Sequence, residues 1–130
     1  MSACTFALGC NPNSTKEQNQ LTNDKARDRA FLEDMYADAY FPKPAVDKGK
    51  AILVDLCARI ETEKPHDLEA LYGLTHQATE AFNRLQQDFD EQGSELETAA
   101  REAIAKDFAF IAEAYGFDAD MEELIAPREW

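Results

Sequence analysis

The sequence predicts an all-α fold, an antiparallel four-helix-bundle-like domain with a short fifth C-terminal helix. Four segments carry apolar residues at alternating spacings of three and four, which is the period of a packed helix. No segment alternates with a period of two, and the 130 residues include only five glycines. Short connections between the segments favour antiparallel neighbours. We expect a single helical domain over residues 22–130, preceded by a disordered or loosely packed leader over residues 1–21.

The leader, MSACTFALGCNPNSTKEQNQL, shows no persistent helical or strand period. Asn23 is a good N-cap and predicts the start of the first helix, over DKARDRAFLEDMYADAY. One face of this helix carries Ala30, Phe31, Met35 and Tyr36. Pro42 and Pro44 end it, because proline is excluded from helix interiors and drives its predecessor toward extended geometry.

A second helix is predicted from about Pro44 to Glu63, where Pro65 marks its exit. Its stripe is Val46, Gly49, Leu53, Leu56 and Ile60. The third helix should begin after the N-cap Asp67 and run to about Gln92. Its stripe is Leu68, Leu71, Thr75, Ala78, Phe82, Leu85 and Phe89. This period fits a seam inside an antiparallel bundle, and a coiled-coil partner is the alternative.

The fourth helix is predicted from Glu95 to about Tyr115, with Gly116 after its end. Ser94 and Glu97 have the spacing of a capping box at its start, and Gly93 suits the left-handed end of the preceding helix. The apolar side carries Leu96, Ala100, Ile104, Phe108, Ile111 and Tyr115. Asp120 and Glu123 form a second capping box before a short terminal helix, MEELIA, which Pro127 ends.

The turn before the fourth helix, DFDEQGSELETA, resembles a calcium loop that begins at Asp88. Acids at alternate positions and Gly93 at the sixth position fit such a loop. Ala99 occupies the twelfth position, where a bidentate glutamate is required. The pattern therefore favours a helix–turn–helix bend over a calcium site.

The formal net charge of −13 is concentrated in the second half of the chain. Residues 66–130 carry sixteen acidic and four basic groups, whereas residues 1–65 carry ten acidic and nine basic groups. Such a field repels nucleic acid and anionic membranes and favours basic partners. The alternative is that the acids only keep the protein soluble. No apolar run approaches the roughly 20 residues of a membrane span.

The three cysteines, Cys4, Cys10 and Cys57, are odd in number and lack metal-type spacing. We expect a reducing, cytoplasmic compartment, with Cys57 as a small core residue. The apolar start of the chain lacks the preceding lysine or arginine of a secretory signal.

The sequence contains no clear metal site and no clear catalytic nucleophile. We therefore expect no cofactor. Enzymatic activity stays open, but it is the less favoured interpretation. Glu63 and His66 have the spacing of a di-iron pair, but Pro65 breaks the helix on which they would align. Two histidines are too few for a three-histidine zinc site. Cys57 would need a base and partial exposure to act as a nucleophile. His76, with Glu80 one turn away, fits a surface or boundary residue better than a catalytic one.

The candidate partner surface combines aromatic and acidic residues, a composition typical of interaction hot spots. Its members are Asp34, Tyr36, Asp38, Tyr40, Phe41, Glu95, Glu97, Glu102 and Trp130. The alternative is that the aromatic rings of Tyr36, Tyr40 and Phe41 close one end of the bundle. For Trp130, the alternative is that its ring docks into a groove. Phe110 lies off the main stripe of the fourth helix, so it either packs the terminal helix or joins an exposed patch. A candidate ligand pocket is formed by Tyr72, His76 and Glu80.

Several phrases of the sequence together resemble a family of small acidic bacterial proteins known only as a domain of unknown function. These phrases are FLEDMYADAYFP, VDKGKAIL, DFAFIAEAYGFDAD and PREW. The resemblance spans about residues 23–130 and implies a bacterial, cytoplasmic helical protein, without activity or site residues to carry over.

Two hypotheses on function follow, and a hydrolase is a weak third. The first is an interaction module that binds a basic protein partner, for example an immunity-type inhibitor of a bacterial toxin. The alternative is a helical module that binds a small molecule or acts in regulation. The oligomeric state, monomer or dimer, is open.

Overall fold

The computed structural model describes residues 12–130, and every regular element in this range is an α-helix. The predicted all-α class is therefore confirmed. The elements are α1 (Pro12–Asn19), α2 (Asp24–Asp28), α3 (Glu33–Ala37), α4 (Lys43–Glu63), α5 (Leu68–Glu91), α6 (Thr98–Ala114) and α7 (Met121–Leu124).

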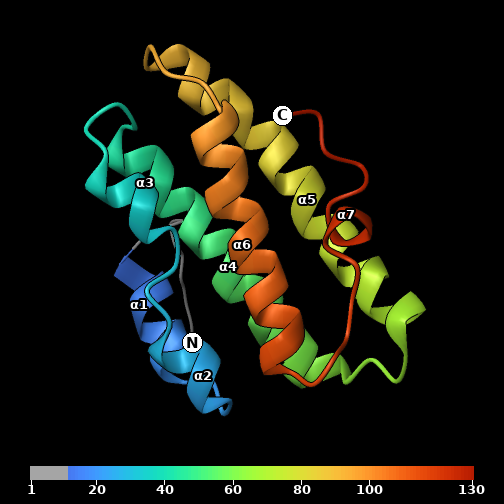
Figure 1. Cartoon of the computed structure of the whole chain (residues 1–130). Helices are drawn as coiled ribbons and strands as arrows, with labels where there is room; N and C mark the ends of the chain where they lie inside the picture. The colour runs from blue at the N-terminus through green and yellow to red at the C-terminus, as the bar shows by residue number, and fades with distance from the viewer. Residues whose placement is uncertain (1–11) are drawn as a thin grey trace.

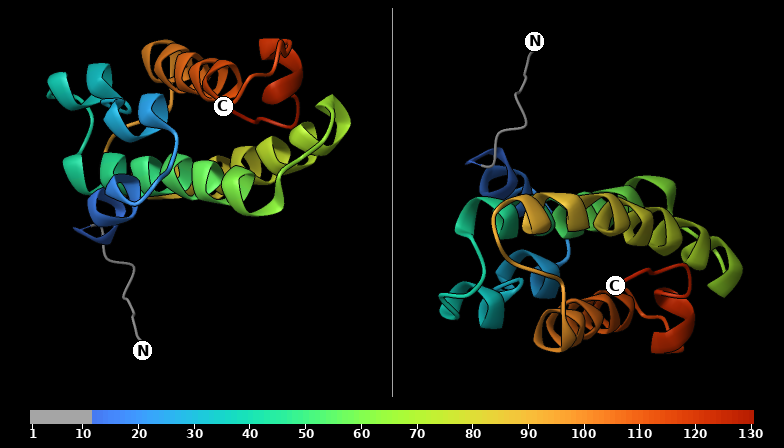
Figure 2. Two further views of the ribbon diagram at one scale, coloured as in Figure 1. Left: turned by 90° about the horizontal axis from the view of Figure 1, so that it is seen from below. Right: turned by 90° about the horizontal axis from the view of Figure 1, so that it is seen from above.

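The three longest helices, α4, α5 and α6, provide the frame of the fold (Figure 1). Helices α4 and α5 lie side by side as one layer, with α6 over one face of it (Figure 2). Short helices complete the arrangement: α2 and α3 contact one side of α6, and α7 contacts α5 and α6. Helix α1 lies against α4 on the face away from α6 (Figure 2).

The predicted stripes of α4, α5 and α6 meet in one core between these layers, except that Leu68 is 38% exposed. Its largest fully buried side chains are Phe31, Phe82, Phe89, Phe108, Leu32, Met35, Leu53, Leu56, Leu71, Ile104, Ile111 and Leu124. Gly49 faces this core from α4, where an added Cβ would lie only 3.0 Å from Leu32 and 3.1 Å from Phe82. The absence of a side chain at this position lets α4 approach α5 and the segment around Leu32 closely.

The ends of α4 and α5 agree with the sequence analysis to within about one residue. Asp67 is the N-cap of α5, and its carboxylate accepts a hydrogen bond of 2.9 Å from the Ala70 N–H. Lys64 ends α4 in the left-handed conformation, with φ of 50°, just before Pro65. Local capping and proline chemistry are sufficient to set these boundaries.

The predicted first helix is wrong as a continuous element, because the chain breaks between α2 and α3. Asn23 does cap α2, accepting a 3.0 Å hydrogen bond from the Ala26 N–H. Leu32, however, has φ of 57°, which an α-helix does not allow. Its N–H donates instead to Asp107 of α6 over 2.7 Å, and its side chain is buried. A long-range carboxylate thus replaces the helical hydrogen bond at this position.

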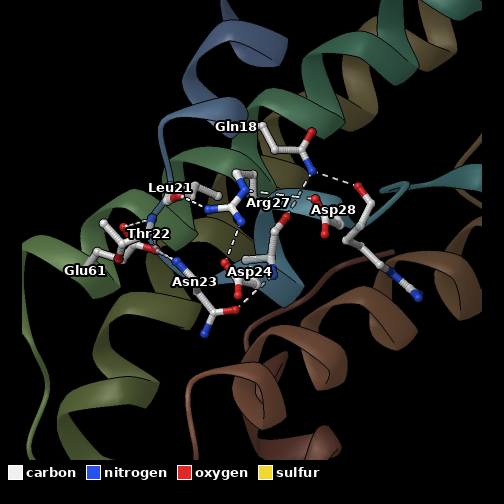
Figure 3. A network of polar contacts seen from close by, with 10 residues as sticks. Gln18, Leu21, Thr22, Asn23, Asp24, Arg27, Asp28 and Glu61 are labelled. Carbon is white, nitrogen blue, oxygen red and sulfur yellow. Dashed lines mark hydrogen bonds and ion pairs between the residues drawn. The ribbon is translucent and has the colours of Figure 1, made fainter.

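Helix α1 was not expected from the sequence, which shows no apolar period there. Its buried anchor is a polar side chain, Gln18, which is only 5% exposed. The Gln18 amide donates to the backbone carbonyls of Ala26 at 3.0 Å and Arg29 at 2.7 Å (Figure 3). Residues 1–11, which include Cys4 and Cys10, lie outside the described residues, whereas residues 12–21 of the expected leader contain α1. The domain boundary at residue 22 stays a prediction.

Glu61 of α4 connects the start of α2 to the long helices (Figure 3). Its carboxylate accepts hydrogen bonds from the backbone N–H groups of Thr22 at 2.9 Å and Asn23 at 3.1 Å, and from the Tyr115 hydroxyl at 2.5 Å. These donors stabilise the ionised form and lower the pKa of Glu61 below its ordinary value, against the opposing effect of burial. The Asn23 amide also donates to the Ala114 carbonyl at 2.7 Å.

Among the helices described here, none combines the length and apolarity needed to cross a membrane.

Candidate functional site

The first predicted group of partner residues lies around the connection from α3 to α4, and its members differ in exposure. Phe41 is buried, with its ring edge-on to Phe89 of α5 at 6.3 Å between centroids. Tyr40 packs on Phe41 at 5.1 Å and is 43% exposed. Phe41 therefore closes this end of the bundle, which was the alternative left open, and Tyr40 remains at the surface.

The other members of this group include two exposed acids and one half-buried tyrosine. Asp34 pairs with Lys106 at 3.4 Å, and Asp38 accepts a 2.9 Å hydrogen bond from the Tyr40 N–H. The Tyr36 hydroxyl donates to Asp47 at 2.5 Å. Burial and this carboxylate raise the pKa of Tyr36 above its usual range. Tyr36 thus acts as a packing residue with a satisfied hydroxyl.

The α5–α6 connection is a helix–turn–helix bend, as expected, but its capping differs from the prediction. Gly93 has φ of 79°, and the Ser94 N–H donates to the Phe89 carbonyl at 2.8 Å to close α5. The predicted capping box is wrong: α6 begins at Thr98, and Glu97 is its N-cap without a side-chain bond. The Ser94 hydroxyl is buried without a hydrogen-bond partner among residues 12–130. Burial of Leu96 inside the turn draws the chain inward and delays the helix.

Two separate segments of the sequence meet at this end of the molecule. The contact of Phe41 with Phe89 and the ion pair of Lys48 with Asp88 hold the start of α4 against the end of α5. Figure 1 shows the α3–α4 and α5–α6 connections at the same end. We use the name acidic end for the exposed acids and the exposed tyrosine in these two connections and in the last two residues of α5: Asp38, Tyr40, Asp90, Glu91, Glu95 and Glu97.

The carboxylates of the acidic end are not neutralised within the described part of the chain. None of its acids forms an ion pair with a lysine, arginine or histidine of residues 12–130. Glu91 accepts one hydrogen bond from Gln87, at 3.2 Å. Glu102, the remaining acid of the predicted surface, is exposed on α6. These exposed carboxylates are therefore solvated and not paired.

Trp130 belongs to the core and not to a surface. It is 7% exposed, its ring meets Phe82 at 6.0 Å, and its carbonyl accepts from Arg101 at 3.4 Å. The groove-docking alternative in the sequence analysis describes this placement.

Two of the predicted pocket residues, Tyr72 and His76, form hydrogen bonds with the α7 segment. Their rings stack at 6.1 Å on α5. The Tyr72 hydroxyl accepts from the Asp120 N–H at 3.2 Å, and His76 Nε2 lies 2.7 Å from the Glu123 carbonyl, so that nitrogen carries the proton. Glu80 is exposed. The polar atoms of Tyr72 and His76 that could bind a ligand are engaged by the backbone of residues 120 and 123.

Cys57 is buried in the core, as expected. Burial, with a further contribution from the charge of Glu61, raises the pKa of its thiol to about 12. A thiol in this state is not a nucleophile at neutral pH. Over residues 12–130, no group of three or more histidine, cysteine, aspartate or glutamate side chains is arranged to hold a metal ion.

A groove that the sequence does not predict runs along α6, and we call it the α6 groove. Its volume is about 760 Å³, and it is lined by Arg29, Lys106, Ala109, Phe110, Ala112, Glu113, Gly116, Phe117, Asp118 and Ala119. Phe110 lies here beneath Arg29, whose guanidinium carbon is 4.3 Å from the ring centroid. Phe110, the aromatic residue that lies off the main stripe, therefore supports the Arg29 guanidinium and lines this groove.

Asp107 fixes the position of Arg29 at the edge of this groove. Its Oδ1 accepts from Arg29 Nη2 at 2.9 Å and Nε at 3.1 Å. Asp107 is 2% exposed, and burial raises the pKa of its carboxyl group although these hydrogen bonds and the arginine charge oppose the shift. The sequence did contain a signal, because Asp107 falls three residues after Ile104 on the apolar face of the helix. An acid on a core face requires a cationic partner.

Comparison with known proteins adds one finding. A family model described as "Family of unknown function (DUF5713)" matches residues 25–130. No match was found among the curated proteins or among the solved structures.

Proposed function

The chain belongs to this family of unknown function, and we propose that it is a protein-interaction module whose acidic end binds a basic protein partner. The observation that carries the proposal is the juxtaposition of two distant segments at that end. The contact of Phe41 with Phe89 joins the connection that carries exposed Tyr40 to the end of α5, where exposed Asp90 and Glu91 precede the turn that carries Glu95 and Glu97. An exposed aromatic ring at the same end of the molecule as several carboxylates is a favourable arrangement for a basic partner, which can contribute cation–π and charge-assisted contacts.

Electrostatics support the same assignment. Grouping like charges at one end destabilises the free protein slightly, and a partner of opposite charge relieves that repulsion. Complementary charge also steers the encounter and raises the association rate. One concrete form of this function is an inhibitor that masks the basic surface of a toxin.

The test is capture of proteins from host lysate on the immobilised protein at low salt, with two variants of equal net charge. The first variant carries Asp90→Asn, Glu91→Gln, Glu95→Gln and Glu97→Gln. The second neutralises four exposed glutamates elsewhere in the molecule, Glu17, Glu69, Glu80 and Glu129. Both variants have a formal net charge four units less negative than the −13 of the wild type.

We expect a basic protein that is retained by the wild type and by the second variant, is lost with the first, and is eluted by moderate salt. Equal loss with both variants would show that only total charge matters. Equal retention by both variants, or no captured protein, would also count against the proposal.

A further inference from the structure

The α6 groove has the dimensions and the chemistry of a ligand site that is separate from the acidic end. Its volume of about 760 Å³ lies within the range of small-molecule sites. Its lining places two cations, Arg29 and Lys106, and two carboxylates, Glu113 and Asp118, around the rings of Phe110 and Phe117. We propose that this groove binds a zwitterion of tripeptide size, with the ligand carboxylate at the cations and the ligand ammonium at the carboxylates.

The cationic end is preorganised by the buried carboxylate behind it. Asp107 engages Nε and Nη2 of Arg29, while Nη1 has no hydrogen-bond acceptor among residues 12–130. Phe110 supports the face of the guanidinium at 4.3 Å. Because the guanidinium is held from two sides, a ligand carboxylate that binds Nη1 restricts little further motion. Lys106 is exposed beside it and adds a second positive charge, which pairs with exposed Asp34 at 3.4 Å and which a ligand carboxylate would share with that acid.

The anionic end combines Glu113, which lies farther along α6, with Asp118 in the segment that follows this helix. Glu113 and Asp118 are exposed, and neither forms an ion pair with a described residue. Lys106 and Glu113 are seven residues apart on α6, which corresponds to about 10 Å of helical rise. An extended peptide spans about 3.3–3.6 Å per residue, so three residues bridge the two ends.

The apolar lining of the groove and the net charge of the protein favour the same class of ligand. Phe110 and Phe117 are half-buried in the groove lining, where they offer apolar surface to a central side chain of the ligand. The formal net charge of −13 repels a ligand with net negative charge. A zwitterion has no net charge and satisfies both ends of the groove. Arg29 and Asp107 hold the α2–α3 break, whereas the carboxylates of Glu113 and Asp118 form no ion pair with a residue of the described part of the chain.

The experiment titrates ¹⁵N-labelled full-length protein with the peptide Ala-Phe-Ala and with the shorter zwitterions Ala-Phe and phenylalanine. We expect the tripeptide to bind most tightly and to shift the amide resonances of Phe110, Glu113 and Phe117. Acetylation of its amino group or amidation of its carboxyl group should each weaken binding about tenfold. The proposal is overturned if none of the three ligands shifts these resonances at millimolar concentration. It is also overturned if the peptide with an acetylated amino group binds as well as the free peptide, because the groove would then read only a carboxylate.

Variants of exposed residues separate a ligand site from a purely structural groove. Lys106→Gln and Glu113→Gln should each weaken tripeptide binding about tenfold while the protein remains folded. The matched controls are Lys16→Gln on α1 and Glu80→Gln on α5, both at exposed positions outside the groove. Unchanged affinity in Lys106→Gln and Glu113→Gln, or equal weakening in the controls, would contradict the assignment. Capture of a basic protein by the acidic end does not depend on this result, so each proposal can fail alone.

Discussion

Asp107 on α6 determines the path of the chain between α2 and α3. It accepts the Leu32 N–H at 2.7 Å and the Arg29 guanidinium at 2.9 Å, and both donors lie more than seventy residues away in the sequence. These bonds compensate for burying the carboxylate. They also hold Leu32 in a backbone conformation that a leucine rarely adopts.

We predict that Asp107→Ala reduces the free energy of unfolding by about 3 kcal/mol, because it removes one partner of a buried ion pair and orphans the Leu32 N–H. Urea denaturation monitored by circular dichroism measures the change. Glu80→Gln, at an exposed position on α5, should stay within about 0.5 kcal/mol of the wild type. A similar small effect for Asp107→Ala would mean that the α2–α3 segment does not depend on this carboxylate.

Glu61 should make the free energy of unfolding depend on pH in the acidic range. Its folded-state pKa is lowered from 4.5, so between the two pKa values the unfolded state binds more protons than the folded state. This contribution is fully present above about pH 4.5 and is lost as the pH falls through the folded-state pKa. Glu61→Gln should therefore lower stability at pH 7 by about 1–2 kcal/mol and flatten the loss on acidification below pH 4.5. Thermal melts from pH 7 to pH 3 test this, and an unchanged pH profile would exclude Glu61 as the source.

At the scale of elements, two glycines inside helices differ in how tightly their surroundings are packed. Substitution by alanine should therefore change the free energy of unfolding in opposite directions at the two positions. An added Cβ at Gly49 of α4 meets Leu32 at 3.0 Å and Phe82 at 3.1 Å, whereas at Gly73 of α5 no atom lies within 4 Å. We expect Gly73→Ala to stabilise the protein by about 0.5–1 kcal/mol through helix propensity. Gly49→Ala should destabilise it by about 1–2 kcal/mol, because overpacking outweighs the same gain. Chemical denaturation of the pair tests the packing of α4 on α5, and stabilisation in both variants would contradict it.

Most of the long elements could be predicted from the sequence because their determinants are local. The stripes of α4 and α5, the cap at Asp67 and the left-handed Gly93 act within a few residues. The break at Leu32 could not be predicted, since the helical period continues through it and the deciding hydrogen bond comes from α6. Helix α1 was missed for a related reason, because it is anchored by the polar side chain of Gln18 and not by an apolar face.

The candidate site was predictable only in part. The sequence indicates which residues are acidic or aromatic, and Asp38, Tyr40, Glu95 and Glu97 are indeed exposed. It does not indicate that Phe41 reaches Phe89, which brings the two connections together. The α6 groove depends on a pairing between Arg29 and Asp107 that no local pattern encodes. Tertiary contacts between distant segments therefore account for what the sequence analysis missed.

At the scale of the whole molecule, the distribution of charge predicts a response to salt. Residues 66–130 carry sixteen acidic and four basic groups, and most of these acids are exposed. Salt screens their mutual repulsion, so the melting temperature should rise between about 0.01 M and 0.2 M NaCl. The rise should be smaller in the variant that neutralises Asp90, Glu91, Glu95 and Glu97. A fall of the melting temperature with added salt would show that attractive ion pairs dominate instead.

The acidic end as a partner surface is tested most directly by the association rate with the captured basic protein. Stopped-flow or surface-based kinetics would compare the wild type with the Asp90→Asn, Glu91→Gln, Glu95→Gln, Glu97→Gln variant at several salt concentrations. We predict that the association rate constant falls by at least about tenfold in the variant, and that it loses most of its dependence on salt. Equal rate constants and equal salt dependence for the two proteins would contradict the assignment of this end as the partner surface.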